Sequence, residues 1–112
     1  MQVHVSGKHI HLTPPMEEYA GRKLEKLSKF YDQISKVDVL VGGEAKDFDV
    51  EGIVHVGHRD PFVARSKGPD FYACIDALVD KLTRQITEHK DRTRNRKHTN
   101  ESADGAWENK QK

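Results

Sequence analysis

Residues 68–86 read GPDFYACIDALVDKLTRQI, and this stretch decides the fold. Its apolar residues recur every three or four positions, which predicts a helix with one buried face. Those residues are Phe71, Cys74, Ile75, Leu78, Leu82 and Ile86. Gly68 and Pro69 interrupt the segment before the helix, and the side chain of Asp70 is placed to cap its first turn.

The region before this helix predicts three strands. Apolar residues alternate with polar ones in two runs and a third strand-like run follows, at residues 37–41, 48–56 and 61–67. The pair Gly42-Gly43 is expected near a turn or a bulge, and residues 57–60 indicate a short connection. This spacing is typical of an antiparallel meander.

The N-terminal region predicts one more strand and one more helix. Residues 2–6 alternate, with Val3 and Val5 on one face. Thr13 can then cap a helix in which Pro14 takes the first position. Apolar residues follow at helical spacing, and the helix should end near residues 30–32; these residues are Met16, Ala20, Leu24, Leu27 and Tyr31. The order is therefore β-α-β-β-β-α, an α+β fold with both helices packed on one face of a four-stranded sheet.

Length and composition indicate one small soluble domain. The chain has 112 residues, of which 35% are hydrophobic and 33% charged, and a single cysteine excludes an internal disulfide. No stretch is long and apolar enough to cross a bilayer, so we expect a cytoplasmic protein. Residues 1–96 should form the domain. Residues 97–112 lack periodicity and predict a disordered tail, in which Trp107 is either idle or stacks on a base or packs on a protein partner.

Basic residues cluster on the exposed faces of both predicted helices. The net charge is only +1, yet residues 78–97 hold seven basic and three acidic residues. One such stripe alone is compatible with an ordinary solvated helix face. Two stripes side by side would merge into one basic surface suited to phosphates. The candidate RNA-binding residues are Arg22, Lys23, Lys26, Lys29, Lys81, Arg84, Lys90 and Arg92.

Catalytic and metal sites are not expected. The closest histidine pairs, His9 with His11 and His55 with His58, lack the fuller ligand set of a zinc site. Cys74 lies within the apolar stripe of the second helix, which predicts a buried, inert thiol. No Ser-His-Asp arrangement stands out. We therefore expect no enzyme activity, no cofactor and no small-molecule substrate.

Several segments resemble the ribosome hibernation promoting factor family, which includes the ribosome-associated inhibitor A proteins. Residues 70–76 (DFYACID) and 80–86 (DKLTRQI), followed by His89 and Lys90, resemble the family's second helix. Residues 3–7 (VHVSG), 12–14 (LTP) and 23–27 (KLEKL) resemble its first strand and helix. The resemblance covers residues 1 to about 95 and is closest to the short members of the family.

This resemblance implies the β-α-β-β-β-α fold and a role in translation. It implies binding to 16S rRNA of the small (30S) ribosomal subunit, in the channel of messenger and transfer RNA. Blocking the A and P sites there would inhibit translation under stress or in stationary phase, without a cofactor, by a protein that is a monomer when free. By position, the expected contacts to rRNA phosphates are Arg22, Lys23, Lys26, Lys81, Arg84 and Lys90.

Two other functions stay open at this point. A generic double-stranded-RNA-binding module has an α-β-β-β-α order like that of residues 14–95. Such modules usually carry a lysine cluster at the start of the last helix, whereas residues 68–72 here (GPDFY) have no basic residue. The other alternative is a small enzyme or metal-dependent protein that uses the histidines.

Overall fold

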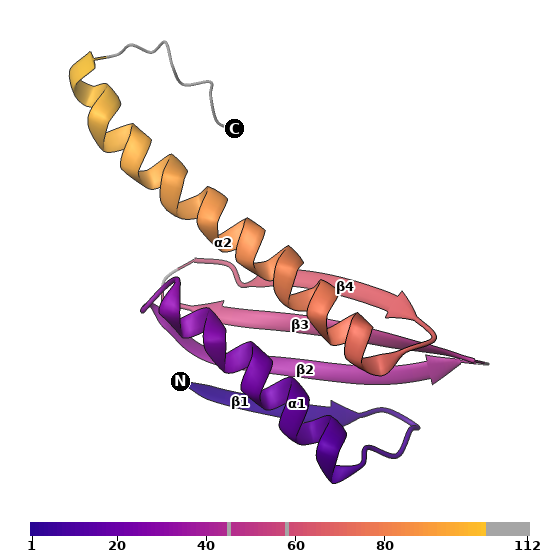
Figure 1. Ribbon diagram of the computed structural model, residues 1–112. Helices are drawn as coiled ribbons and strands as arrows, with labels where there is room; N and C mark the ends of the chain where they lie inside the picture. The colour runs from indigo at the N-terminus through magenta and orange to yellow at the C-terminus, as the bar shows by residue number, and fades with distance from the viewer. Residues whose placement is uncertain (45, 58, 103–112) are drawn as a thin grey trace.

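The protein is built of two layers, a mixed four-stranded sheet and a layer of helices that covers one of its faces (Figure 1). The computed structural model describes residues 1–44, 46–57 and 59–102. The elements, in chain order, are β1 (Gln2–Gly7), α1 (Pro14–Glu25), the 3-10 helix η1 (Lys26–Lys29), β2 (Ile34–Glu44), β3 (Asp47–Val56), β4 (Phe62–Gly68) and α2 (Phe71–Ser102). The predicted α+β fold and its β-α-β-β-β-α order are confirmed.

The strands lie in the order β1-β2-β3-β4. The pairs β2–β3 and β3–β4 are antiparallel, which confirms the predicted meander. The strand β1 pairs with β2 in parallel, with Val3 opposite Val37 and Val5 opposite Val39. This parallel pairing follows from α1, which returns the chain to the end of the sheet from which β1 started.

Gly42-Gly43 lies near a turn, as expected, because β2 ends at Glu44 and β3 begins at Asp47. Both glycines lie inside β2, where Gly42 pairs with Asp49 and Gly43 with Phe48. A Cβ atom on Gly43 would lie 3.2 Å from Cδ1 of Ile10. Gly43 therefore provides space for the segment that follows β1, rather than for a change of chain direction.

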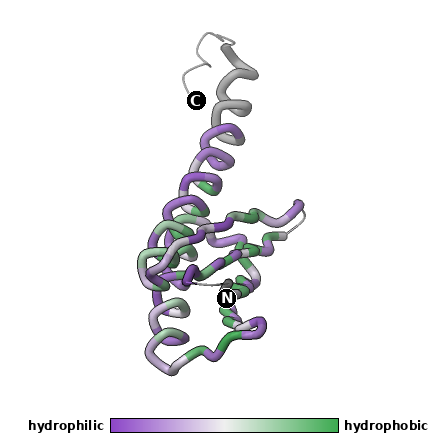
Figure 2. The backbone as a smooth tube through the Cα atoms, turned by 90° about the vertical axis from the view of Figure 1, so that its right-hand side faces the viewer, coloured by the Kyte–Doolittle hydropathy of each residue, from purple (hydrophilic) through white to green (hydrophobic). Residues whose placement is uncertain are grey.

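The core lies between the sheet and the helices, as the apolar stripes predict. The stripe of α2 is buried completely, and in α1 and η1 Ala20, Leu24 and Leu27 are fully buried as well. They pack against the inward-facing valines of the sheet, which are Val37, Val39, Val41, Val50 and Val54. Figure 2 shows hydrophobic residues distributed along the strands and both helices, whereas the coloured part of α2 that leaves the sheet is mostly hydrophilic.

Both predicted helix caps are present. The Oγ1 atom of Thr13 accepts the backbone N–H of Met16 at 3.3 Å, and Pro14 begins α1. The Oδ1 atom of Asp70 accepts the backbone N–H of Tyr72 at 3.0 Å. Each cap satisfies a backbone donor that has no partner within its own helix, so both helix starts are fixed by local sequence.

The helix α2 continues beyond the sheet and ends at Ser102, so that the molecule measures 53 × 25 × 19 Å. The segment expected to be a disordered tail therefore begins inside this helix. Residues 103–112, with Trp107, lie outside the described residues, and the division into a domain and a tail stays a prediction. No helix within the described part of the chain is long and apolar enough to span a membrane.

The close contact between α2 and β3 gives a test of the fold. A Cβ atom on Gly52 would lie 3.0 Å from Cδ1 of Leu82 and 3.1 Å from Cδ2 of Leu78. We expect Gly52→Ala to lower the free energy of unfolding by roughly 1–3 kcal/mol, because the overpacked helix must shift. Urea denaturation measures this change.

Gly21→Ala is the matched control. Nothing lies within 4 Å of a Cβ atom on Gly21, which is inside α1. This substitution should raise the stability by roughly 0.5–1 kcal/mol, because alanine favours the helix more than glycine does. Equal urea midpoints for the parent protein and Gly52→Ala would contradict the packing described here.

Candidate nucleic-acid interface

All eight predicted RNA-binding residues lie on the helix layer. Arg22 and Lys23 belong to α1, Lys26 and Lys29 belong to η1, and the other four belong to α2. Seven are exposed, whereas the side chain of Lys23 keeps only 27% of its accessible surface. The structure divides the seven exposed residues into two groups, one on each flank of α2.

The first group lines a continuous groove beside α1 and η1, here called the α1 groove. One hollow of about 490 Å³ contains Arg22, Lys26 and Lys29, and the next, of about 440 Å³, contains Lys29 and Lys90. The two hollows share Ser28 and Lys29, and they therefore form one path. The lining residues are Met1, Arg22, Glu25, Lys26, Ser28, Lys29, Phe30, Tyr31, Asp32, Gln33 and Lys90.

Lys90 reaches this groove from α2 through one hydrogen bond. Its Nζ atom donates to the backbone carbonyl of Phe30, the residue that ends η1. The last carbonyls of a helix have no partner within that helix, so an ammonium group is stabilised there. Lys29 and Lys90, which are far apart in the sequence, thereby meet in one hollow.

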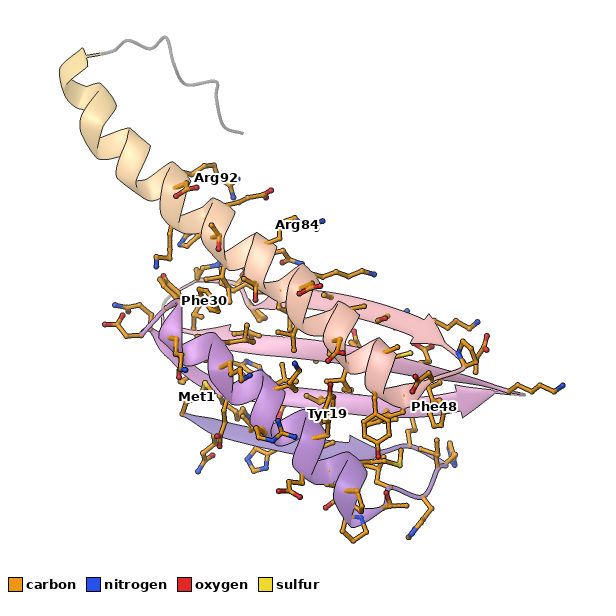
Figure 3. The ribbon with its side chains drawn as sticks, viewed as in Figure 1. Met1, Tyr19, Phe30, Phe48, Arg84 and Arg92 are labelled. Carbon is orange, nitrogen blue, oxygen red and sulfur yellow. The ribbon has the colours of Figure 1, made fainter. Side chains whose placement is uncertain are left out.

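The second group consists of Lys81, Arg84 and Arg92 and is here called the α2 flank. Figure 3 shows Arg84 and Arg92 on the side of α2 that faces away from α1. On the same side, the Nζ atom of Lys81 donates to the backbone carbonyl of Arg65 at 2.6 Å. This contact holds the ammonium group against β4.

Gln85 joins Lys81 in covering the edge of the sheet. Its Nε2 atom donates to the backbone carbonyl of Val63 at 2.9 Å. The strand β4 is an edge strand, and its outward carbonyls would otherwise be open to pairing with another chain. This function of Gln85 and Lys81 could not be predicted from the sequence, because the spacing along α2 does not reveal which strand lies beside it.

Acidic residues of α2 lie between the two groups. Asp76 and Asp80 are exposed on the outward face of the helix, so the eight cations do not form one uninterrupted stripe. The carboxylate of Asp76 lies 3.5 Å from the ammonium group of Lys23. The charge of Lys23 is therefore partly balanced within the protein.

Asp76 also binds Tyr19. The hydroxyl of Tyr19 donates to Oδ1 of Asp76 at 2.7 Å, and this hydrogen bond raises the pKa of Tyr19. The cationic groups of Arg22 and Lys23 lie 5.3 and 5.6 Å from the centre of the Tyr19 ring. These contacts join α1 to α2 and orient the beginning of the α1 groove.

An aromatic cluster supports α2 where it leaves the sheet. The ring of Tyr31 meets those of Phe62 and His89 edge-on, with centroids 6.4 and 5.8 Å away. The guanidinium carbon of Arg59 lies 4.2 Å from the centre of the Phe62 ring, and its Nη1 atom is 3.1 Å from Nδ1 of His89. This cluster fixes the position of the neighbouring Lys90. The sequence did not reveal this cluster, because its members come from three distant segments.

The opposite face of the sheet carries charges in pairs. Arg65 lies 3.7 Å from Glu51, and Lys36 lies 3.8 Å from Asp38. The ring of His55 contacts the same carboxylate of Asp38 at 3.1 Å. Pairing reduces the field that this face presents to a polyanion, so the helix layer is the better candidate interface.

The residues considered for metal binding or catalysis are not gathered into a site. Within residues 1–44, 46–57 and 59–102, no group of three or more His, Cys, Asp or Glu side chains could hold a metal ion. Cys74 is buried, as predicted, and burial raises the pKa of its thiol. A thiol with a raised pKa is a poor nucleophile at neutral pH.

Comparison with known proteins identifies the family. Residues 3–94 match the family described as sigma 54 modulation protein / S30EA ribosomal protein. The chain belongs to this family. It is a family of ribosome-associated proteins and not of enzymes.

Relatives named ribosome hibernation promoting factor are similar over nearly their whole length. The relative from Klebsiella oxytoca is 36% identical over 82% of this chain and 96% of its own, and the one from Azotobacter vinelandii is 34% identical over 93% and 96%. A ribosomal subunit interface protein from Coxiella burnetii has a similar fold, with a TM-score of 0.75 at 22% identity over 81% of this chain and 99% of its own.

The contacts of Lys81 and Gln85 predict a cost in stability that Arg84 does not share. We expect Lys81→Ala and Gln85→Ala each to lower the free energy of unfolding by roughly 0.5–1.5 kcal/mol, because each leaves a carbonyl of β4 without its donor. Arg84→Ala, as an exposed control on the same helix, should change it by less than about 0.5 kcal/mol. Urea denaturation compares the three variants, and equal losses in all three would contradict the proposed covering of the β4 edge.

Proposed function

We propose that this protein is a ribosome hibernation factor. It binds the small ribosomal subunit through 16S rRNA, in the channel of messenger and transfer RNA, and blocks the A and P sites under stress or in stationary phase. The names of the curated relatives and their coverage support the hibernation role. The observation that carries the RNA contact is the α1 groove, in which Arg22, Lys26, Lys29 and Lys90 line one path.

The α1 groove has the properties that a phosphate backbone requires. No ion pair forms between Arg22, Lys26 or Lys29 and any other residue within the described part of the chain. Their charges are exposed and held on a rigid helix, so that each can replace a counterion of the RNA. Arg84 and Arg92 on the α2 flank provide a second row of such charges. Lys23, whose charge is partly balanced by Asp76, should contribute less.

The structure gives little support to a generic double-stranded-RNA-binding module. Modules of that kind place basic residues at the start of the last helix. Here the carboxylate of Asp70 occupies that position and caps α2. An anionic cap satisfies the backbone donors that would otherwise attract a phosphate.

Salt dependence of binding to small subunits tests the contact. The logarithm of the affinity should fall linearly with that of the salt concentration, with a slope of roughly −0.7 to −0.9 per phosphate contact. We expect the double variant Arg22→Gln/Lys26→Gln to weaken binding and to make this slope shallower by roughly 1.5, as the loss of two such contacts requires. Cosedimentation at several salt concentrations measures both quantities.

Two further double variants complete this experiment. Arg84→Gln/Arg92→Gln tests the α2 flank with the same change in charge and should also weaken binding. Lys46→Gln/Lys67→Gln is the matched control, since both lysines are exposed outside the helix layer, after β2 and on β4. If this control weakens binding as much as the groove variant, the affinity reflects net charge alone and the proposed interface is wrong.

Competition tests the site on the ribosome. Small subunits loaded with messenger RNA and P-site transfer RNA should bind the protein more weakly than empty subunits, because exclusion is reciprocal at equilibrium. The measurement is the dissociation constant on empty and on loaded subunits. Equal constants would place the protein outside the channel, even if the salt dependence is as expected.

A further inference from the structure

Phe30 is an exposed aromatic residue at the end of η1. Its accessible fraction is 42%, whereas Phe62 and Phe71 retain only 4% and 3%. Figure 3 shows Phe30 at the end of the first helical segment, beside the middle of α2. A single exposed apolar residue is common on protein surfaces, so exposure by itself assigns no function. The surroundings of the ring indicate a function.

The ring lies in the second hollow of the α1 groove. This hollow of about 440 Å³ is lined by Ser28, Lys29, Phe30, Tyr31, Asp32, Gln33 and Lys90. The cations Lys29 and Lys90 come from η1 and α2, so basic side chains line this hollow from two elements. The hollow continues through Ser28 and Lys29 into the part of the groove that contains Arg22 and Lys26.

The backbone of Phe30 is held at both of its polar groups. Its N–H donates to the carbonyl of Leu27 at 2.9 Å, and its own carbonyl accepts the ammonium group of Lys90. Tyr31, the next residue, is fixed by ring contacts with Phe62 and His89. No such ring contact involves Phe30 in the described part of the chain. The backbone of Phe30 is therefore fixed, while its ring remains available for contact with a ligand.

We propose that Phe30 is a stacking platform for one unpaired base of RNA, with Lys29 and Lys90 beside the phosphates of the same strand. A positively charged path combined with an exposed aromatic ring is the arrangement that binds single-stranded nucleic acid. The bases of a duplex are stacked on both sides, so the ring requires an unpaired base. This inference rests on the proposed function and specifies a contact within it.

Two substitutions of Phe30 test whether the aromatic face of its ring is needed for binding. Phe30→Leu keeps an apolar side chain but removes the aromatic face, and Phe30→Tyr keeps that face. We expect Phe30→Leu to weaken binding to small subunits roughly tenfold, as the loss of one base stack requires. The salt slope should not change, because no charge is removed. Phe30→Tyr should bind like the parent protein, and equally weak binding by both variants would overturn the proposal.

Fluorescence tests stacking directly. Trp107 is the only tryptophan of the chain, so the variant Phe30→Trp/Trp107→Phe has a single reporter in the hollow. Short oligoadenylate should quench this reporter. An abasic oligonucleotide of the same length, which has the same phosphates but no bases, should leave it nearly unchanged. Equal quenching by both probes would overturn the proposal.

Two outcomes separate this inference from the function on which it rests. If Phe30→Leu binds small subunits like the parent protein and oligoadenylate leaves the fluorescence of the reporter variant unaffected, stacking is wrong and the ribosome contact stands. If oligoadenylate quenches the reporter while the parent protein fails to bind small subunits, the base platform stands and the proposed function is wrong. A reporter that changes with small subunits but not with oligoadenylate would indicate a protein contact and would also overturn the proposal.

Discussion

The close approach of α2 to β3 is the constraint on which the other features depend. The side chains of Leu82 and Leu78 lie only 3.0 and 3.1 Å from the position that a Cβ atom of residue 52 would take, so glycine at this position lets the helix come this near to the sheet. At this distance the whole apolar face of α2 is removed from water. Burying each large aliphatic side chain contributes roughly 1.5–3 kcal/mol, which makes this contact the main stabilising interaction of a small domain.

This packing also fixes the rotation of α2, and with it the direction of its charged residues. Once Leu78 and Leu82 face the sheet, Lys81 and Gln85 must point toward β4, and Lys90 must point toward the end of η1. The same rotation leaves Asp76 and Asp80 on the outward face. One apolar contact thus determines that the cations of α2 divide between the α1 groove and the α2 flank.

Local signals in the sequence predicted much of the fold. Thr13 and Asp70 mark the starts of the two helices because a cap is a contact within four residues. The alternating runs predicted the antiparallel strands, because alternation is also a pattern among residues that are close in the sequence. Gly42-Gly43 lies near the connection from β2 to β3, as expected, but Gly43 also accommodates Ile10 from a different segment, which the sequence did not predict. Glycine serves both turns and close approaches, and only the tertiary neighbours distinguish these two uses.

The sequence by itself determined the element order, the buried stripes, the family and the eight candidate cations on the helix layer. It also placed Lys29 and Arg22 on one face, because helical spacing fixes neighbours within an element. Only the tertiary structure decided that Lys90 joins Lys29 beside the exposed ring of Phe30, and that Lys81 is held against β4. The physical reason is that these contacts join residues of separate elements. The distance between these elements depends on how closely α2 packs on the sheet. The spacing of apolar residues along the chain does not determine that distance.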